Sequence, residues 1–210
     1  MRTEIISENN GKAKMKQKEK NSLEPGMELV ITRWVGLQGT ALAAKSREAE
    51  LLRRFPASMV LEAQSFARFL DTREDEAAAI QEGARAVYRL GSQGVLSGLW
   101  NAAEASGVGL QAELRRIPIR QETVEICEYF QINPYYLLSG GSLLLGAADG
   151  YGLAARLSRR GIPAVTIGQA DSGNDRILYN QGIRRYLDRP KPDEIYKCGD
   201  CLTERRESNE

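Results

Sequence analysis

Ala84 to Gly107 read ARAVYRLGSQGVLSGLWNAAEASG, and this stretch predicts a short buried strand, a glycine turn and an amphipathic helix. The segment Gly91–Gly94 is a cluster of turn-forming residues. After it, apolar side chains recur at i, i+3, i+4 and i+7, the spacing of one helix face, at Leu96, Leu99, Trp100 and Ala103. We expect Ser92 to cap the start of this helix and Gly107 to end it.

This turn is the first candidate site. A strand that leads through a glycine turn into a helix directs free backbone N–H groups and the positive end of the helix dipole at one point. We predict that phosphate or sulfate binds weakly there, held by Gly91, Ser92 and Gly94, with the Arg89 guanidinium as the charged partner. The structural alternative is a tight connection between strand and helix that binds nothing.

The composition is that of an ordinary globular protein. The chain has 210 residues, 42% of them hydrophobic and 27% charged, which is enough for one sizeable domain with a core. A net charge of +1 predicts no general attraction to nucleic acid or to a membrane surface. No apolar run approaches the roughly 20 residues of a membrane span. The absence of histidine excludes histidine bases, histidine-dependent nucleophiles and histidine metal ligands from this chain.

The two ends differ from the rest of the chain. Residues 1–24 are polar with alternating lysines, which predicts a disordered basic tail rather than an arm that binds nucleic acid, because no aromatic residue lies among the lysines. The ordered domain is expected at residues 25–197. Residues 198–210 form a polar tail with a Cys-x-x-Cys motif, which we expect to be mobile and to hold no part of the fold.

Between these ends, strand and helix patterns alternate irregularly. Predicted strands lie at residues 29–35, 84–90, 108–114, 143–147, 164–167, 176–179 and 183–186, the last two joined by a hairpin turn at Asn180–Gly182. Helices are predicted over residues 40–52, 59–70, 71–82, 93–106, 121–130 and 149–160. Because the order is not a strict βαβ alternation, we predict an α+β fold, a layered mixed sheet with packed helices.

Three cysteines give an odd count and no disulfide framework, so a reducing cytoplasm is the expected location. Cys127 lies on an apolar helix face, where a small core residue is favoured over a reactive thiol. For Cys198 and Cys201 we keep three alternatives: zinc shared across a dimer, a redox dithiol, and an idle tail.

Several segments together resemble a known family. They are ELVITRWVGLQGTALAA from Glu28, LRRFP from Leu52, GLWNAAEASGVGL from Gly98, RRIPIRQETVEICEYFQINPYYLLSGGSLLL from Arg115, GIPAVTIG from Gly161 and GNDRILYN from Gly173. In this order they resemble the C-terminal domain of the aminoimidazole ribonucleotide (AIR) synthetase superfamily. The most similar subgroup is the AIR synthase-related proteins akin to the hydrogenase maturation factor of the E class.

The resemblance implies an α/β domain that normally follows an ATP-binding domain, usually in a homodimer. Members transfer the γ-phosphate of ATP to an amide or similar carbonyl oxygen. Magnesium and its acidic ligands belong to the N-terminal domain, so ATP and Mg²⁺ are implied here only with a separate nucleotide-binding domain. The C-terminal domain closes the cleft with glycine-rich turns. This adds Ser139, Gly140, Gly141 and Ser142 to the predicted anion-binding residues and leaves no residue of this chain as a catalytic candidate.

The chain departs from the family at the first turn. The family's turn resembles His-Asp-x-Thr-x-Gly-Gly, whereas residues 88–94 read YRLGSQG, so Gly94 alone is kept and a carboxylate is replaced by Arg89. The E-class factors also carry a terminal cysteine that is carbamoylated, but Cys201 is followed by further residues. We therefore expect a stand-alone C-terminal domain that is not catalytic by itself. The alternatives are one half of a split ATP-dependent synthetase or dehydratase, and a metal- or redox-responsive module.

Overall fold

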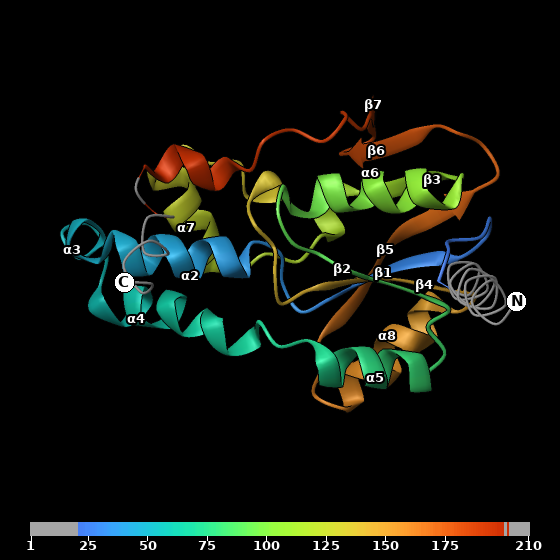
Figure 1. The fold of residues 1–210 in the computed structure, drawn as a ribbon, viewed down its shortest axis with the longest axis horizontal. Coiled ribbons are helices and arrows are strands. Elements are labelled where there is room, and N and C mark those ends of the chain that lie inside the picture. Colours follow the sequence, from blue (N-terminus) through green and yellow to red (C-terminus); the bar gives the residue numbers. More distant parts are fainter. Residues whose placement is uncertain (1–20, 200, 202–210) are drawn as a thin grey trace, which may run out of the picture.

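The computed structural model describes residues 21–199 and 201, so residues 1–20 of the predicted basic tail and residues 202–210 of the predicted polar tail lie outside the described range. The strands are β1 (Glu28–Thr32), β2 (Ala86–Arg89), β3 (Gly109–Glu113), β4 (Leu143–Ala147), β5 (Ala164–Asp171), β6 (Arg176–Asn180) and β7 (Ile183–Tyr186) (Figure 1). The α-helices are α2 (Leu37–Ser46), α3 (Glu48–Leu51), α4 (Ala57–Ser65), α5 (Arg73–Gln81), α6 (Gly94–Ser106), α7 (Gln121–Tyr129) and α8 (Gly150–Arg159). Short 3₁₀ helices are η1 (Phe66–Phe69), η2 (Leu114–Arg116), η3 (Pro134–Tyr136) and η4 (Glu194–Cys198).

The strands form one mixed sheet in the order β2-β4-β1-β5-β3-β6-β7. Most neighbours are antiparallel, and β3 with β6 is the parallel pair. The predicted α+β layered fold is therefore confirmed. The predicted hairpin is also present, with Gln181 and Gly182 in the left-handed backbone region that such a turn requires.

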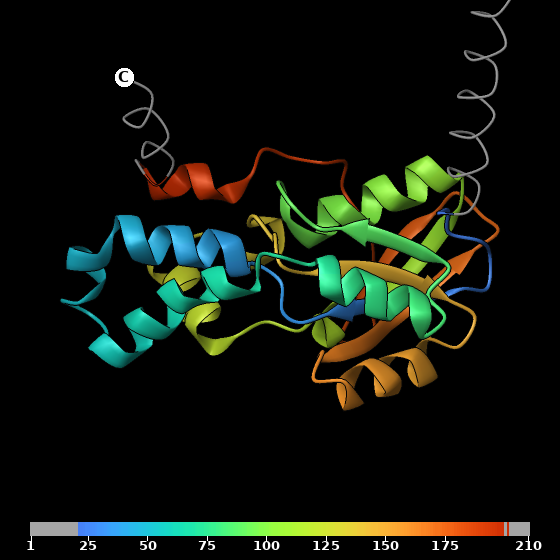
Figure 2. The ribbon, with the colours of Figure 1, turned by 60° about the horizontal axis from the view of Figure 1, so that its bottom comes forward.

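The sheet buries both faces of its central strands. Leu29 and Ile31 of β1 pack in a core with Leu99 of α6, whereas Val30 packs in a second core with Ala79 of α5 and Leu153 of α8. This follows from the alternation of side chains along a strand. Helix α6 thus covers one face, and α5 and α8 cover the other (Figure 2).

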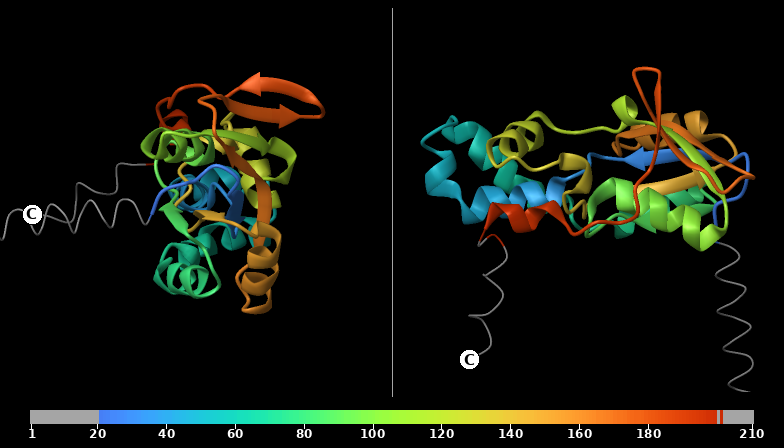
Figure 3. Two further views of the ribbon diagram at one scale, coloured as in Figure 1. Left: turned by 90° about the vertical axis from the view of Figure 1, so that its right-hand side faces the viewer. Right: turned by 90° about the horizontal axis from the view of Figure 1, so that it is seen from above.

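A group of helices extends beyond one end of the sheet. Helices α2, α3, α4 and α7 share a third core that includes Ala44, Leu51, Val60 and Ile126, and η4 adds Ile195 to it. Figures 1 and 3 show this helical end to one side of the sheet layer. The turn before α6 lies where the two parts meet, because η3 contacts both α6 and α7.

Some element boundaries differ from the predicted ones. The first strand ends at Thr32 rather than at Val35, because Arg33 adopts a left-handed backbone conformation with φ 55°. The strand predicted to end at Ile167 continues to Asp171, where it pairs with β3. The N-cap position of α6 is Gln93, not Ser92, and the Gln93 side chain makes no capping hydrogen bond. In the part of the chain that the structure describes, no helix has the length and hydropathy of a membrane span.

The start of the ordered chain was placed too late at residue 25. Leu23 is 2% exposed and packs in the core under α6. The Asn21 side chain donates to the carbonyl of Val87 and accepts from its N–H group, at 3.0 and 2.6 Å. Residues 21–24 therefore cover part of the edge strand β2 and belong to the folded domain.

Candidate functional site

The two glycine-rich turns predicted from the sequence lie against each other. The N–H group of Leu90 donates to the carbonyl of Ser142 at 3.0 Å, and the N–H group of Ser139 donates to the carbonyl of Gly91 at 2.9 Å. At the centre, Gln93 and Gly94 both have positive φ, 68° and 74°, and Gly94 begins α6. The turn that precedes the helix is therefore built from two segments that are distant in sequence.

The carboxylate of Asp193 lies at this turn. Its oxygens accept hydrogen bonds from the backbone N–H groups of Gln93 at 2.6 Å, Leu138 at 3.2 Å and Ile195 at 2.9 Å. Asp193 is 7% exposed. A carboxylate held by backbone N–H groups beside a helix N-terminus has the environment expected for an oxyanion. In this structure the chain itself supplies the anion.

The serines and glycines of the second turn have structural roles. The Ser139 hydroxyl donates to the carbonyl of Leu137 and accepts from the N–H group of Gly36, at 2.7 and 2.9 Å. The Ser142 hydroxyl donates to the carbonyl of Trp34 at 2.5 Å. A Cβ atom at Gly140 would lie 2.1 Å from the Gln38 side chain, and one at Gly141 would lie 2.9 Å from the carbonyl of Phe69. These side chains and glycines pack the turn against the start of α2 and its neighbours. Their hydroxyl groups are used in these contacts, so the groups of the turn that donate to Asp193 are backbone N–H groups.

Arg89 does not join the turn. Its guanidinium donates to both carboxylate oxygens of Glu76 in α5, on the opposite side of the sheet from α6. These hydrogen bonds raise the pKa of Arg89 and lower the pKa of Glu76. Both residues line a surface hollow of 1010 Å³ beside the edge strand β2. Because Val87, two residues earlier, packs on the α5 face, strand alternation directs Arg89 to that face as well.

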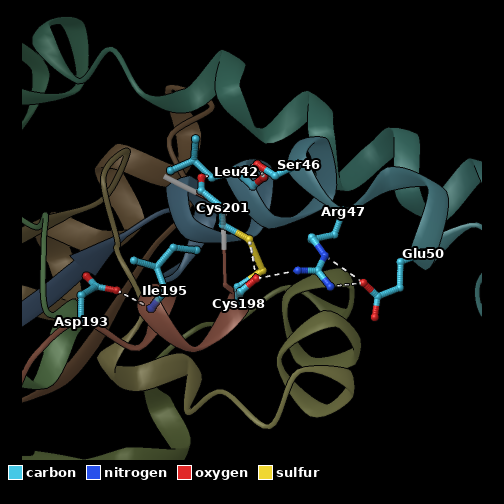
Figure 4. Close-up of a disulfide and its surroundings, with 8 residues drawn as sticks. All are labelled: Leu42, Ser46, Arg47, Glu50, Asp193, Ile195, Cys198 and Cys201. Atoms are coloured by element: carbon cyan, nitrogen blue, oxygen red, sulfur yellow. Dashed lines mark hydrogen bonds and ion pairs between the residues drawn. A yellow bond between two sulfur atoms is a disulfide. The ribbon is translucent and has the colours of Figure 1, made fainter. Parts of the chain in front are cut away.

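The segment after β7 crosses the surface from the sheet to the helical end, and we call residues 188–199 with Cys201 the C-terminal strap (Figure 3). Cys198 and Cys201 form a disulfide, and each is 2% exposed in the core shared with α2 and α7 (Figure 4). Arg47 donates to the carbonyl of Cys198 at 3.1 Å, and the Ser46 hydroxyl donates to that of Cys201 at 3.4 Å.

The expectation of a mobile Cys-x-x-Cys tail is therefore wrong for these residues. The polar sequence around the motif suggested that it has little apolar surface to bury. In the structure, Ile195 and the two sulfur atoms supply that surface and pack into the core of helices α2, α4 and α7. With both sulfurs in a disulfide, neither is a thiolate ligand of the kind the zinc alternative requires. Among the described residues no group of three or more acidic or cysteine side chains is arranged to hold a metal ion.

Cys127 is confirmed as a core residue. It is 1% exposed, and burial raises the pKa of its thiol to about 12. A thiol with this pKa stays protonated at neutral pH and is a poor nucleophile.

Replacing both strap cysteines by serine is expected to lower the free energy of unfolding by about 2 to 4 kcal/mol. The disulfide closes a short loop, for which the chain-entropy term is about 2 kcal/mol, and each buried serine hydroxyl adds a desolvation cost. Urea unfolding of the double variant measures the loss. The double alanine variant, which buries no hydroxyl, should lose less, and an unchanged unfolding midpoint in both would contradict the buried position of the motif.

Sequence reasoning missed Asp193, the residue that contributes the side chain at the turn. The sequence offered one local signal for Asp193. An aspartate directly after a proline is typical of a helix N-cap, and the Asp193 carboxylate indeed accepts a hydrogen bond from the N–H group of Ile195, two residues later, at the start of η4. Nothing local indicates the bond to Gln93, which is 100 residues away.

Comparisons with known proteins identify relatives of this chain. Residues 24–179 match the family described as AIR synthase related protein, C-terminal domain. A carbamoyl dehydratase HypE of Rhodobacter capsulatus is 31% identical over 117 residues, which are 52% of this chain and 34% of that protein.

Solved structures show the same fold. HypE of E. coli is similar with a TM-score of 0.62 and 20% sequence identity, and the match covers 82% of this chain and 52% of that one. A HypE in complex with ATP is similar with a TM-score of 0.62 and 15% identity, and the match covers 84% of this chain and 54% of that one. Thiamine monophosphate kinase of Aquifex aeolicus is also similar, with a TM-score of 0.54 and 19% identity, and the match covers 79% of this chain and 53% of that one. The chain thus spans about a third of the curated relative and about half of these structures. Its sequence match and its fold together place the chain in the AIR synthase related family, as a C-terminal domain of that family.

Proposed function

We propose that this chain supplies the phosphate-facing wall of an ATP-dependent enzyme, and that a separate domain holds the nucleotide and its magnesium. The observation that carries this proposal is the joined turn before α6, whose N–H groups of Gln93 and Leu138 already hold a carboxylate. Backbone donors beside a helix N-terminus suit phosphate as well as carboxylate. The turn is the element by which the domain contacts the anion.

The comparisons support the reaction class of the completed enzyme. The curated relative is named a carbamoyl dehydratase, and one similar structure is a HypE with ATP. A carbonyl-activating reaction on an amide-like or carbamoyl group is therefore the activity we assign to the assembly. ATP supplies the phosphoryl group when bound. The residues of this chain would orient its phosphates through the turn, and they supply no metal ligand in this proposal.

The partner that completes the site is a nucleotide-binding domain on another chain. HypE itself occurs in a solved HypE–HypF complex, which shows that a relative assembles with another protein. Sedimentation of the purified chain with a candidate nucleotide-binding chain from the same cell tests this arrangement.

The purified chain is expected to hydrolyse no ATP above background. Phosphoryl transfer depends on metal ions and cationic groups placed around the γ-phosphate, and a wall that only faces the phosphates does not provide them. Magnesium-dependent phosphate release, measured across the fractions of a gel-filtration peak, tests this. Hydrolysis that follows the protein peak would contradict the proposal. Hydrolysis that appears only after a nucleotide-binding chain is added would identify the split enzyme.

The disulfide supports a second candidate function, a redox-responsive module. It does so over a zinc-responsive module, because the sulfur atoms are bonded to each other. In that case a dithiol reductant reduces Cys198–Cys201 to two thiols and is itself oxidised to a disulfide. Titration of the bond in dithiothreitol buffers of known potential, followed by thiol alkylation and mass measurement, gives its reduction potential. A potential far below that of the cellular thiol pool would make the bond purely structural.

A further inference from the structure

The strap and Leu187, the residue before it, are attached to the fold by contacts of different character. At its start, Leu187 is buried against the sheet core, and its N–H group donates to the carbonyl of Arg176 at 2.7 Å. In the middle, the Asp193 carboxylate lies at the turn. At its end, Ile195 and the cysteines pack in the helical core. Of these, Asp193 is the attachment that a dissolved anion could replace.

The residues between these attachments are weakly held. Residues 188–192 have no regular secondary structure, and all except Pro190 are exposed. Its side-chain contacts lie at the surface: Lys191 forms an exposed ion pair with Asp188, a type that contributes little to stability, and its ammonium group lies 5.6 Å from the centre of the Tyr136 ring. Pro190 and Pro192 favour an extended backbone, which suits a connection that spans a surface. The hydrogen bonds that a lift at Asp193 would break come from Gln93, Leu138 and Asn133, and none of these three residues lies in a strand.

We infer that the strap is an internal ligand of the turn, and that Asp193 must leave before an external oxyanion binds. The inference rests on the proposed function, because it concerns the same turn. The N–H groups of Gln93 and Leu138 converge on one carboxylate. They cannot donate to a phosphate in the same position, and two anions at one site repel each other. The external ligand is a phosphate group or a carboxylate, since both accept from backbone N–H groups.

Competition with a tethered group lowers the apparent affinity for the external anion. The measured affinity equals the intrinsic affinity multiplied by the fraction of molecules whose turn is open. A tether of a few residues keeps its group at a high local concentration. The closed state should therefore dominate, and the chain with Asp193 in place should bind phosphate poorly.

The test compares four proteins by calorimetric titration with inorganic phosphate. Asp193→Ala removes the internal ligand, Asp193→Asn keeps the shape without the charge, and Asp188→Asn is the matched control on the same strap, since Asp188 contacts Lys191 and not the turn. We expect phosphate to bind at least about tenfold more tightly to Asp193→Ala than to the parent, with Asp193→Asn between them and Asp188→Asn equal to the parent. Circular dichroism establishes that each variant is folded.

The parent protein gives a second readout that needs no variant. Phosphate should accelerate hydrogen exchange at the N–H group of Ile195, which donates to Asp193, while exchange in the β4 strand stays unchanged. Equal phosphate affinity in parent and Asp193→Ala, with unchanged exchange at Ile195, would overturn the inference while leaving the proposed function intact. Binding to none of the four proteins would overturn both.

Discussion

The Gly94→Ala protein is expected to lose about 2 to 4 kcal/mol of folding free energy. Gly94 has φ 74°, a conformation that costs a residue with a Cβ atom about 1 kcal/mol or more. The added Cβ would also lie 2.3 Å from the carbonyl oxygen of Tyr135 and 2.6 Å from the Cα atom of Tyr136. Both contacts are to backbone, so the segment after α7 would have to move away from α6, at a further cost of about 1 to 3 kcal/mol.

Gly91→Ala is the matched control, because it adds the same methyl group to the same turn. No atom lies within 4 Å of a Cβ placed at Gly91, and its φ is not in the left-handed region. Urea unfolding should therefore give a stability close to that of the parent, with Gly94→Ala shifted far below both. Similar losses in the two variants would contradict the close packing of the turns.

Asp75→Ala is expected to lower the free energy of unfolding by about 3 to 5 kcal/mol. The Asp75 side chain is 4% exposed and accepts two hydrogen bonds from the Arg33 guanidinium, at 2.5 and 2.8 Å. Its removal leaves a largely buried arginine without its counterion, which is the costly way to break such a pair. Arg33 also ends β1 and stacks over the Phe69 ring at 5.1 Å, so its displacement would reach η1 and the start of α2.

Asp71→Ala provides the contrast for this prediction. Asp71 pairs with Arg73 near the start of the same helix, and these hydrogen bonds lower the pKa of Asp71 to about 2. Its side chain is 57% exposed, however, and exposed pairs add little to stability. Thermal unfolding of Asp71→Ala should match the parent, whereas Asp75→Ala should melt many degrees lower. A large loss in both variants, or in neither, would refute the role of burial.

Periodicity and turn chemistry predicted most of the fold. The strand, glycine turn and helix of residues 84–107 appear as β2 and α6, and the strand at Leu143–Ala147 has the predicted bounds. These elements are specified locally, by apolar spacing and by glycines that allow a left-handed backbone. The sequence also grouped the two turns correctly, although through resemblance to a family and not through any local signal.

The site was predicted less well because its decisive contacts are long-range. The position of Arg89 in the chain predicts that it belongs to the turn, but its side chain lies on the sheet face that α5 covers, where it donates to Glu76. Cys198 and Cys201 were assigned to a mobile tail from their polar neighbours, but helices α2 and α7 offer them a core. Asp193 reaches Gln93 over 100 residues. Each of these outcomes depends on tertiary packing that residue spacing does not encode.

We propose that the turn before α6 binds an oxyanion through its backbone N–H groups. The decisive measurement is the change in amide proton and nitrogen chemical shifts of the Asp193→Ala protein during a titration with inorganic phosphate. We expect saturable shifts that are largest at Gln93 and Leu138, whose N–H groups lie outside the strap and donate to Asp193 in the parent. Shifts that are absent there, or that concentrate at Arg89 and the hollow beside β2, would contradict it.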